Sequence, residues 1–428
     1  MNPRSVLNSE LIKKLPNEVK VLFEIFGDEI RLVGGSVRDL LLEKKVNDFD
    51  FATRFLPQET TKVLEKNKIK AVPTGVKFGT ITAVVNGKNF EITTLRKDSE
   101  TDGRHCSPEF VDDYFLDAAR RDFTINALYL DSAGLITDYF DGISDLENKK
   151  VKFIGDANKR IEEDFLRILR FFRFSNEYAQ DLDIEGLAAC VKQKENLKKL
   201  SRERIRAEFL KMLMSAKKEN LIAVLKVLES QKIAAEIFSS KLDIQALEHL
   251  FEIEEKLEIS ADLNLKMAVL FCEENLDLKI FGKEICATNA EKKFFDFVSL
   301  HHDGPRNKCG VTNKSSIANL LICHPALVAG SISELNKLLL LAEKETVLNL
   351  YLLTFAKNYD PKKIPEVKKI INFLQNFFLP IFPLKSEDLI ELGFFGKNLG
   401  IALQKAKEIW AENDFKMTKS ELIASLKE

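Results

Sequence analysis

The chain lacks three features that would decide its class at once: a long apolar run, a paired-cysteine motif and an excess of one charge. No segment of its 428 residues approaches the ~18 consecutive apolar residues of a membrane helix, and residues 1–15 lack the apolar stretch of a secretory signal. The six cysteines form no CxxC pair, which argues against a disulfide framework. With 64 basic and 66 acidic residues, the chain lacks the excess of positive charge of a protein that coats nucleic acid. We therefore expect a cytoplasmic globular protein that does not bind membranes.

Two common nucleotide-binding motifs are also missing. No GxGxxG follows a predicted strand, and no GxxxxGKS or GxxxxGKT occurs anywhere in the chain. These motifs mark dinucleotide-binding folds and P-loop proteins respectively. The sequence therefore favours neither a dinucleotide-binding fold nor a P-loop protein.

Arginine is scarce and unevenly placed. The chain has 48 Lys but only 16 Arg, and 14 of the Arg lie between Arg31 and Arg206. A guanidinium offers a planar fork that grips phosphate, carboxylate or a base edge in a fixed orientation, whereas a solvated surface accepts either cation. We therefore expect the residues that carry the chemistry of the protein in the first half of the chain.

The pattern of apolar residues indicates an α+β chain with its strands in the front part. Short or alternating apolar runs predict strands over 29–33, 47–52, 78–85 and 89–95. Asn86-Gly87, between the last two, is a strong signal for a tight hairpin. Apolar residues at three-to-four spacing predict helices over 36–42, 117–129 and 161–174, and the chain after 161 reads as all-helical.

A glycine turn after the first strand predicts a phosphate site. Gly34 and Gly35 allow the backbone to approach a phosphate closely, and Ser36 is expected to cap a helix whose first N–H groups face the same place. Arg38 can add a charge-assisted fork. We interpret this turn as the seat of a triphosphate.

Three acidic residues follow on neighbouring predicted strands. Asp48 and Asp50 are two residues apart, so in a strand both carboxylates lie on one face and can converge on Mg²⁺. Glu91, on the second hairpin strand, is a candidate third carboxylate. An Asp-x-Asp pair alone is more often a solvated turn, but here it follows a Gly-Gly-x-x-Arg turn, which favours two-metal nucleotidyl transfer.

Two arginine-rich segments complete the candidate site. The sequence around Arg121 reads DAARRDFTINAL, and residues 160–174 read RIEEDFLRILRFFRF. On a helix, Asp164 and Arg167 are i,i+3 neighbours that can present an acceptor beside a donor. Cytosine and adenine share the complementary edge, so this pair can select both bases against uracil and guanine. Taken alone, a solvated ion pair is the better interpretation.

These motifs, in this order, resemble those of the bacterial class II tRNA nucleotidyltransferases (CCA-adding enzymes) and their poly(A) polymerase relatives. The resemblance is specific over about residues 31–174. It implies that Asp48 and Asp50 hold Mg²⁺ with Glu91 as a third catalytic carboxylate. It further implies three groups of nucleotide-binding residues: Gly35, Arg38 and Arg121 at the triphosphate and sugar, Asp164 and Arg167 at the base, and Arg170 and Arg173 in support.

The resemblance also implies an architecture and an activity. It predicts a polymerase-β-like head (1–150), a helical neck (151–215), a helical body (216–345) and a helical tail that binds tRNA (346–428). Glycine, proline and serine gather at 303–333, which we expect to be an insertion loop in the body. The implied activity is template-independent addition of CCA to tRNA from CTP and ATP. A poly(A) polymerase, or an enzyme that adds only CC or only A, carries the same motifs, and the oligomeric state stays open.

Overall fold

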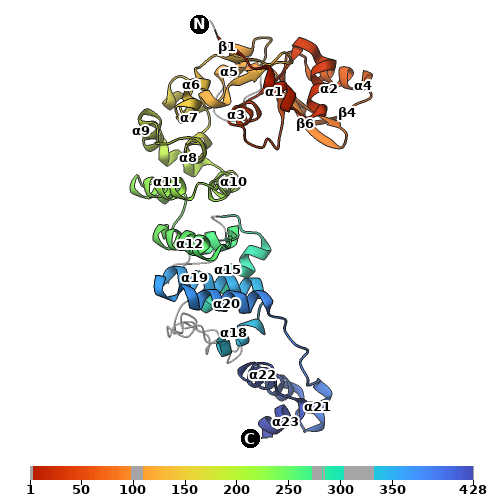
Figure 1. The fold of residues 1–428 in the computed structure, drawn as a ribbon, viewed down its shortest axis with the longest axis vertical. Helices are drawn as coiled ribbons and strands as arrows, with labels where there is room; N and C mark the ends of the chain where they lie inside the picture. Colours follow the sequence, from red (N-terminus) through yellow and green to blue (C-terminus); the bar gives the residue numbers. More distant parts are fainter. Residues whose placement is uncertain (1–2, 98–108, 272–281, 283–284, 303–331, 428) are drawn as a thin grey trace. The chain divides into compact units, whose positions relative to one another are not determined.

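The computed structural model describes residues 3–97, 109–271, 282, 285–302 and 332–427, and the chain forms two compact units, residues 1–220 and 221–428 (Figure 1). The first unit contains an eight-stranded mixed sheet in the order β1-β10-β9-β2-β3-β6-β5-β4. Its strands are β1 (Arg4–Leu7), β2 (Ile30–Val33), β3 (Asp50–Thr53), β4 (Lys70–Gly75), β5 (Thr80–Val85), β6 (Lys88–Thr94), β9 (Leu128–Leu130) and β10 (Leu135–Asp138). A separate pair is formed by β7 (Arg96–Lys97) and β8 (Glu109–Phe110).

The sheet brings the predicted glycine turn and acidic strand side by side. β3 pairs antiparallel with β2 and parallel with β6, and Asp50 lies opposite Glu91 in that register. β5 and β6 form the predicted hairpin, where Asn86 (φ 51°) and Gly87 (φ 77°) both take the positive φ of a type I′ turn.

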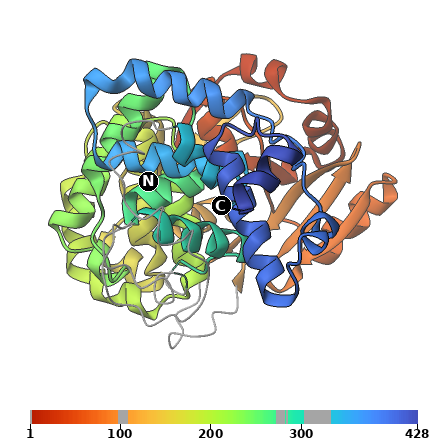
Figure 2. The ribbon, with the colours of Figure 1, turned by 90° about the horizontal axis from the view of Figure 1, so that it is seen from below.

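Helices cover the sheet on the side away from the candidate site. α2 (Asn17–Phe26) and α4 (Pro57–Lys66) lie together against the strands (Figures 1 and 2). Their buried side chains, such as Phe23 and Leu64, join the strand residues Phe51 and Phe90 in one apolar core. Burial of this core fixes the strands that present the acidic residues. The short helix α1 (Ser9–Lys14) precedes α2.

The helix predicted over 117–129 is wrong. Only α5 (Tyr114–Ala119) is helical, followed by a 3₁₀ turn at Thr124–Asn126 and by β9. β9 is buried between β2 and β10, so all three of its residues are covered from both sides. A fully buried strand shows no alternation, and its continuous apolar run imitates helical spacing.

The single helix predicted over 161–174 is two helices. α7 (Ala157–Glu163) and α8 (Leu166–Tyr178) are separated at Asp164, whose backbone is extended (φ −154°, ψ 105°). The Asp164 carboxylate accepts a hydrogen bond from the Leu166 N–H at 3.1 Å, so the residue ends one helix and starts the next. The first unit ends with α9 (Ile184–Gln193) and α10 (Arg202–Leu213), and α6 (Gly142–Glu147) precedes α7.

The second unit is helical, as predicted. Its described elements are the body of α11 (Lys218–Ser230), α12 (Ile244–Leu257), α13 (Leu263–Phe271), α15 (Asn289–His302), α18 (Ile332–Leu339), α19 (Lys344–Lys357), α20 (Ile364–Asn376), α21 (Ser386–Glu391), α22 (Gly396–Glu412) and α23 (Lys419–Lys427). No strand follows β10 in the described part of the chain, which confirms the α+β class. The four-part division into head, neck, body and tail stays a prediction.

Two further predictions concern the second half of the chain. The insertion loop predicted at 303–333 lies outside the described residues, except for its last two positions, which begin α18. Within the described ranges no helix has both the length and the apolar character to cross a membrane.

Candidate functional site

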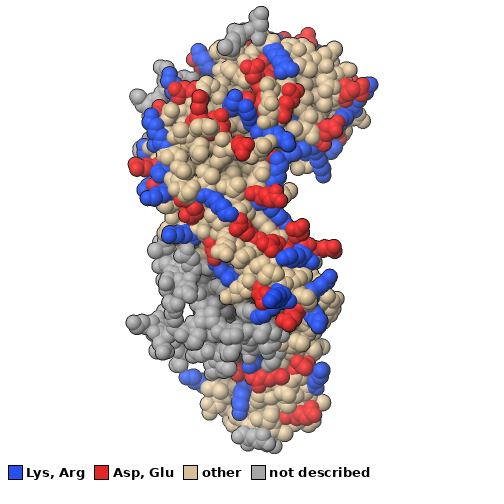
Figure 3. Space-filling model, turned by 60° about the vertical axis from the view of Figure 1, so that its left-hand side comes forward, with Lys and Arg blue, Asp and Glu red and all other residues tan. Residues whose placement is uncertain are grey.

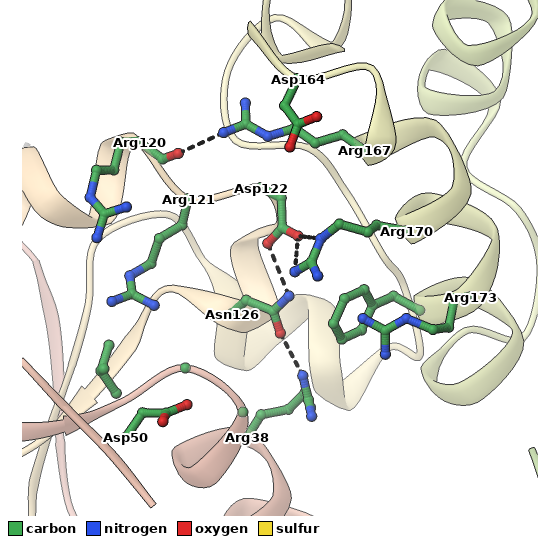
Figure 4. Close-up of a pocket in the computed structure, with 14 residues that line it drawn as sticks. Arg38, Asp50, Arg120, Arg121, Asp122, Asn126, Asp164, Arg167, Arg170 and Arg173 are labelled. Atoms are coloured by element: carbon green, nitrogen blue, oxygen red, sulfur yellow. Dashed lines mark hydrogen bonds and ion pairs between the residues drawn. The ribbon is translucent and has the colours of Figure 1, made fainter. Parts of the chain in front are cut away.

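A cavity of about 410 Å³ in the first unit collects most of the predicted site residues (Figure 4). It lies between the end of β2, the start of β3, the segment after α5 and the outer face of α8. All predicted site residues except Asp48 and Glu91 line it. The lining residues are Val33, Gly34, Gly35, Arg38, Asp50, Arg120, Arg121, Asp122, Asn126, Asp164, Arg167, Arg170, Arg173 and Phe174.

The glycine turn shapes one wall of the cavity. Gly34 has φ +72°, and a Cβ there would stand 3.2 Å from the Arg121 Nη1, so any side chain would be strained and would push the guanidinium away. Gly34, not Ser36, occupies the N-cap of α3 (Gly35–Leu41), which corrects the predicted cap. The Ser36 hydroxyl instead donates to the Val33 carbonyl at 3.0 Å.

A chain of hydrogen bonds crosses the cavity from α3 to α8. The buried Arg38 donates to the Asn126 Oδ1 at 2.5 Å, and the Asn126 Nδ2 donates to the Asp122 Oδ1 at 3.0 Å. The other oxygen of Asp122 accepts from the Arg170 Nε at 2.7 Å. Burial opposes ionisation of Asp122, but Arg170 and Asn126 outweigh it and hold the pKa of this carboxyl below its usual range. Asp122 is therefore charged, and it fixes one arginine directly and another through Asn126.

Arg120 and Arg121 are held from behind by a buried carboxylate. Asp117 is 1% exposed and accepts from the Arg120 Nε at 2.8 Å and from the Arg121 Nη2 at 3.0 Å. The Tyr129 hydroxyl donates to the same carboxylate at 2.7 Å. Burial raises the pKa of Asp117, but the two arginines and Tyr129 lower it more, to about 2. Both guanidinium groups are thus fixed at one end and face the cavity with the other (Figure 4).

Arg170 and Arg173 are fixed in the same way from the far side of α8. The Arg173 Nε donates to the Glu208 Oε2 of α10 at 2.6 Å, and the Arg170 Nη1 lies 3.8 Å from the Glu208 Oε1. The Arg173 guanidinium also lies 4.0 Å from the centre of the Phe174 ring. Glu208 is buried, so these contacts are little screened by solvent.

The prediction that Asp164 and Arg167 are i,i+3 neighbours on one helix is wrong, although both residues line the cavity. Arg167 donates to the backbone carbonyls of Arg160 at 2.8 Å and Arg120 at 3.0 Å. Asp164 accepts from the Arg204 Nη2 of α10 at 2.8 Å. Because Asp164 sits in the break between two helices, the i,i+3 geometry of one helix does not apply to it. The two side chains reach the same cavity from separate supports.

The three acidic residues lie near one another, and their joint role as metal ligands stays a prediction. β3 begins at Asp50, and the exposed Asp48 precedes the strand. Burial first, then the charges of Glu91 and Asp48, raise the pKa of Asp50 against the opposing effect of Arg121. Within the described ranges, no three His, Cys, Asp or Glu side chains are placed to hold one metal ion. The three-carboxylate site therefore stays a prediction.

The Asp48 and Asp50 pair nevertheless fits a divalent cation chemically. Carboxylate oxygens are the ligands that Mg²⁺ prefers. The charge of Asp48 is one of the causes that raise the pKa of Asp50, and a cation between the two carboxylates would relieve this repulsion. The rest of the cavity has the opposite character, because six arginines and three aspartates line it, which suits an anion with several negative charges.

Sequence reasoning missed five lining residues: Val33, Arg120, Asp122, Asn126 and Phe174. Asp122 and Asn126 were visible as polar positions four residues apart. The helix predicted over them does not form, so their place in the cavity could not be deduced from helical spacing.

Comparison with known proteins assigns the family. Residues 30–152 match the family model described as "Poly A polymerase head domain", and residues 181–238 match the one described as "Probable RNA and SrmB- binding site of polymerase A". The human mitochondrial CCA tRNA nucleotidyltransferase 1 is 33% identical over 440 residues, covering 96% of this chain and 89% of the relative. The CCA-adding enzyme of Lactobacillus helveticus is 33% identical over 303 residues, covering 68% and 73%.

Solved structures share the fold. A Bacillus stearothermophilus CCA-adding enzyme in complex with CTP superposes with a TM-score of 0.71 at 24% identity, covering 96% of each chain. A Thermotoga maritima CCA-adding enzyme complexed with tRNA gives 0.70 at 21% identity over 100% of each chain. Two relatives are at least 30% identical to this chain over most of the length of both proteins. The chain therefore belongs to the family of CCA-adding tRNA nucleotidyltransferases.

Proposed function

We propose that the arginine-lined cavity is the site where this protein transfers nucleotides to RNA. The protein is a tRNA nucleotidyltransferase that adds CCA to the 3′ end of tRNA from CTP and ATP, without a nucleic-acid template and with release of pyrophosphate. The observation that carries the residue-level proposal is the set of arginines fixed around one cavity that also contains Asp50.

The triphosphate is proposed to bind between the glycine turn and the segment after α5. Gly35 leaves the backbone open to a phosphate, and Arg38 and Arg121 supply guanidinium forks on either side of it. Both arginines are already held by Asn126 and Asp117 respectively. Little side-chain entropy is then lost when the phosphates bind, which favours tight and oriented binding.

Asp48 and Asp50 are proposed to hold Mg²⁺, with Glu91 as the nearby third carboxylate. When bound, such a cation lowers the charge barrier to attack of the terminal 3′-hydroxyl on the α-phosphate. The contribution of the chain is placement: β3 brings Asp50 to the cavity wall, where the charge of Arg121 acts on it, and the loop before β3 carries Asp48. The raised pKa of Asp50 supports this role, because a bound cation relieves the repulsion.

The base is proposed to lie against Asp164 and Arg167, with Arg170 and Arg173 supporting the nucleotide. A carboxylate accepts from the exocyclic amine shared by cytosine and adenine, and a guanidinium donates to the adjacent ring nitrogen. Because Arg204 and the backbone carbonyls hold these two side chains separately, each presents a fixed edge.

The activity is tested with purified protein, Mg²⁺ and a tRNA transcript that ends at the discriminator base. CTP and ATP are supplied singly and together, and the products are sequenced. We expect CC with CTP, followed by one A when ATP is added. Long A tails on any RNA would instead indicate a poly(A) polymerase, and CC or A alone would indicate a partial enzyme.

Replacing Asp164 with asparagine is expected to weaken base selection. The amide retains an acceptor for the Leu166 N–H but places a donor where the carboxylate accepted, so the preference for CTP over UTP should fall by roughly tenfold to a hundredfold. Single-turnover incorporation with each of the four nucleotides measures it.

Glu162→Gln is the matched control. Glu162 lies two residues away and accepts from the Gln193 side chain, a role that glutamine keeps, so this variant should select normally. Unchanged selection in Asp164→Asn would refute the base-reading role.

The cytoplasmic location remains a proposal. The relatives include a mitochondrial protein by name, so fractionation of the native cell with antibody detection is the appropriate test.

A further inference from the structure

A second cavity in the first unit has a different composition from the nucleotide site. It measures about 490 Å³ and lies between the end of α6, the end of α8 and the segment that leads from α10 into α11. No predicted site residue lines it. Its lining residues are Lys149, Ala179, Gln180, Ala216, Lys217, Lys218, Glu219 and Asn220.

Three lysines, Lys149, Lys217 and Lys218, and one acid, Glu219, line the cavity, so positive charge is in excess. Lys149 and Lys217 form no ion pair with any described residue. Burial lowers the pKa of Lys217, and the charges of Lys44 and Lys149 lower it further. The nearby acid Glu177 is already used, because it accepts from the Lys44 Nζ at 2.5 Å and from the Ser215 Oγ at 3.1 Å. A second anion beside Lys149 and Lys217 would relieve this repulsion.

The cavity is also tied to the nucleotide site. Phe174 of α8 lines the first cavity, and Ala179, directly after the same helix, lines the second, about 8 Å further along the axis. Tyr178 joins the two regions, since its hydroxyl donates to Asp39 at 3.0 Å and its ring lies 4.5 Å from the Lys44 Nζ. Lys44 itself belongs to the loop that leads to Asp48.

Charged side chains of both signs occur together on the one face of the molecule that Figure 3 draws. On the face drawn in Figure 3, basic and acidic side chains are interspersed with no extended basic patch. The net charge of −2 gives no general attraction for RNA either. Phosphate contacts in such a protein have to come from local clusters, and a charged groove beside an active site is the usual track for a nucleic-acid backbone.

We infer that Lys149 and Lys217 bind the sugar-phosphate backbone of the RNA substrate. The backbone that they bind belongs to the strand whose 3′ end enters the nucleotide cavity. This site rests on the proposed function, because it serves the same RNA substrate. It would hold the strand upstream of the reacting end while the catalytic residues act on the end itself.

The test is the double variant Lys149→Gln with Lys217→Gln in the full chain. The dissociation constant for a tRNA lacking CCA is measured at several salt concentrations. We expect it to rise roughly three- to tenfold at about 0.1 M salt, and the slope of log K against log salt to flatten by about one to two units. The KM for CTP and the rate at saturating tRNA should stay unchanged, because neither lysine lines the nucleotide cavity.

The chain offers a matched control. Lys68 follows the C-cap Asn67 of α4 with φ 59°, as Lys149 follows the C-cap Asn148 of α6 with φ 52°. The variant Lys66→Gln with Lys68→Gln therefore makes the same charge change, with one lysine in the same backbone conformation, and should bind tRNA normally. Equal effects of the two double variants would overturn the inference.

Chemical protection separates RNA from small anions. Modification of Lys149 and Lys217 by an amine-reactive reagent, read by mass spectrometry, should fall when tRNA is added and stay unchanged with CTP or pyrophosphate. Protection by pyrophosphate alone would overturn the inference in favour of a small-anion site. A wild-type protein that binds no tRNA would refute the proposed function and this site together, whereas normal binding by the variant refutes this site alone.

Discussion

Replacing Asp50 with asparagine is expected to abolish nucleotide incorporation while leaving the fold intact. Asparagine has the same shape but cannot neutralise a divalent cation, and loss of that interaction should lower the rate by at least about a thousandfold, or about 4 kcal/mol. A primer-extension assay with tRNA and CTP measures the change. Binding of tRNA should stay close to that of the wild type, because Asp50 contributes no positive charge.

Stability gives a second, independent readout for the same variant. Burial and the neighbouring charges of Glu91 and Asp48 raise the pKa of Asp50, so its charged form is disfavoured in the folded state. Removing the charge should therefore leave the melting temperature unchanged or raise it. Added Mg²⁺ should raise the melting temperature of the wild type and have little effect on Asp50→Asn.

Asp28→Asn is the control for a general effect of charge loss in the head. Asp28 is exposed in the turn before β2 and should give normal incorporation and a normal response to Mg²⁺. Normal incorporation by Asp50→Asn would refute the proposed catalytic role. Loss of activity with a lowered melting temperature would make Asp50 a structural residue.

The sequence predicted well what local chemistry determines. The Gly34-Gly35 turn needs glycine at its first position, because Gly34 takes a φ of +72°. Asn86-Gly87 adopts the positive φ values that its turn type requires. In both places one or two residues decide the backbone, so the pattern alone is sufficient.

The sequence could not predict contacts between distant residues. Arg204 binds Asp164 across 40 positions, and Glu208 binds Arg173 across 35. No periodicity links these pairs; they meet because α10 packs along α8. The base-reading pair was therefore assigned to one helix, although its two members have separate supports.

The prediction for the segment after α5 was wrong for a different reason. Its buried strand β9 and its 3₁₀ turn resemble a helix in sequence, so no role was predicted for Asp117. The structure makes Asp117 the buried anchor of two cavity arginines, which changes what its substitution should do.

Asp117→Asn is accordingly expected to be strongly destabilising. The amide keeps the shape of the side chain but leaves Arg120 and Arg121 without their buried counter-charge. Removing one partner of a buried ion pair typically costs about 3–5 kcal/mol. The free energy of unfolding of the first unit should fall by about that amount, and the KM for CTP should rise because Arg121 loses its support.

The stabilising effect of Asp117 should decrease as the pH falls. The folded pKa of Asp117 is about 2, below the ~3.9 of an unfolded aspartate, so its stabilising effect is complete above about pH 5. It is lost as the pH falls from about 4 towards 2, and it amounts to about 2.6 kcal/mol. The stability difference between wild type and Asp117→Asn should shrink over that range and stay constant at higher pH.

The single tryptophan separates the two units in this experiment. Trp410 lies in the second unit, so its fluorescence follows that unit, whereas far-ultraviolet circular dichroism follows both. In urea, Asp117→Asn should show an early transition by circular dichroism and an unshifted transition by Trp410 fluorescence.

Asp131→Asn is the control, because Asp131 accepts hydrogen bonds from the Ala133 and Leu135 N–H groups, a role that asparagine retains. An Asp117→Asn protein as stable as this control would mean that solvent, not Asp117, balances the charge of the two arginines. The nucleotide cavity would then be organised by Asp122 and Glu208 alone.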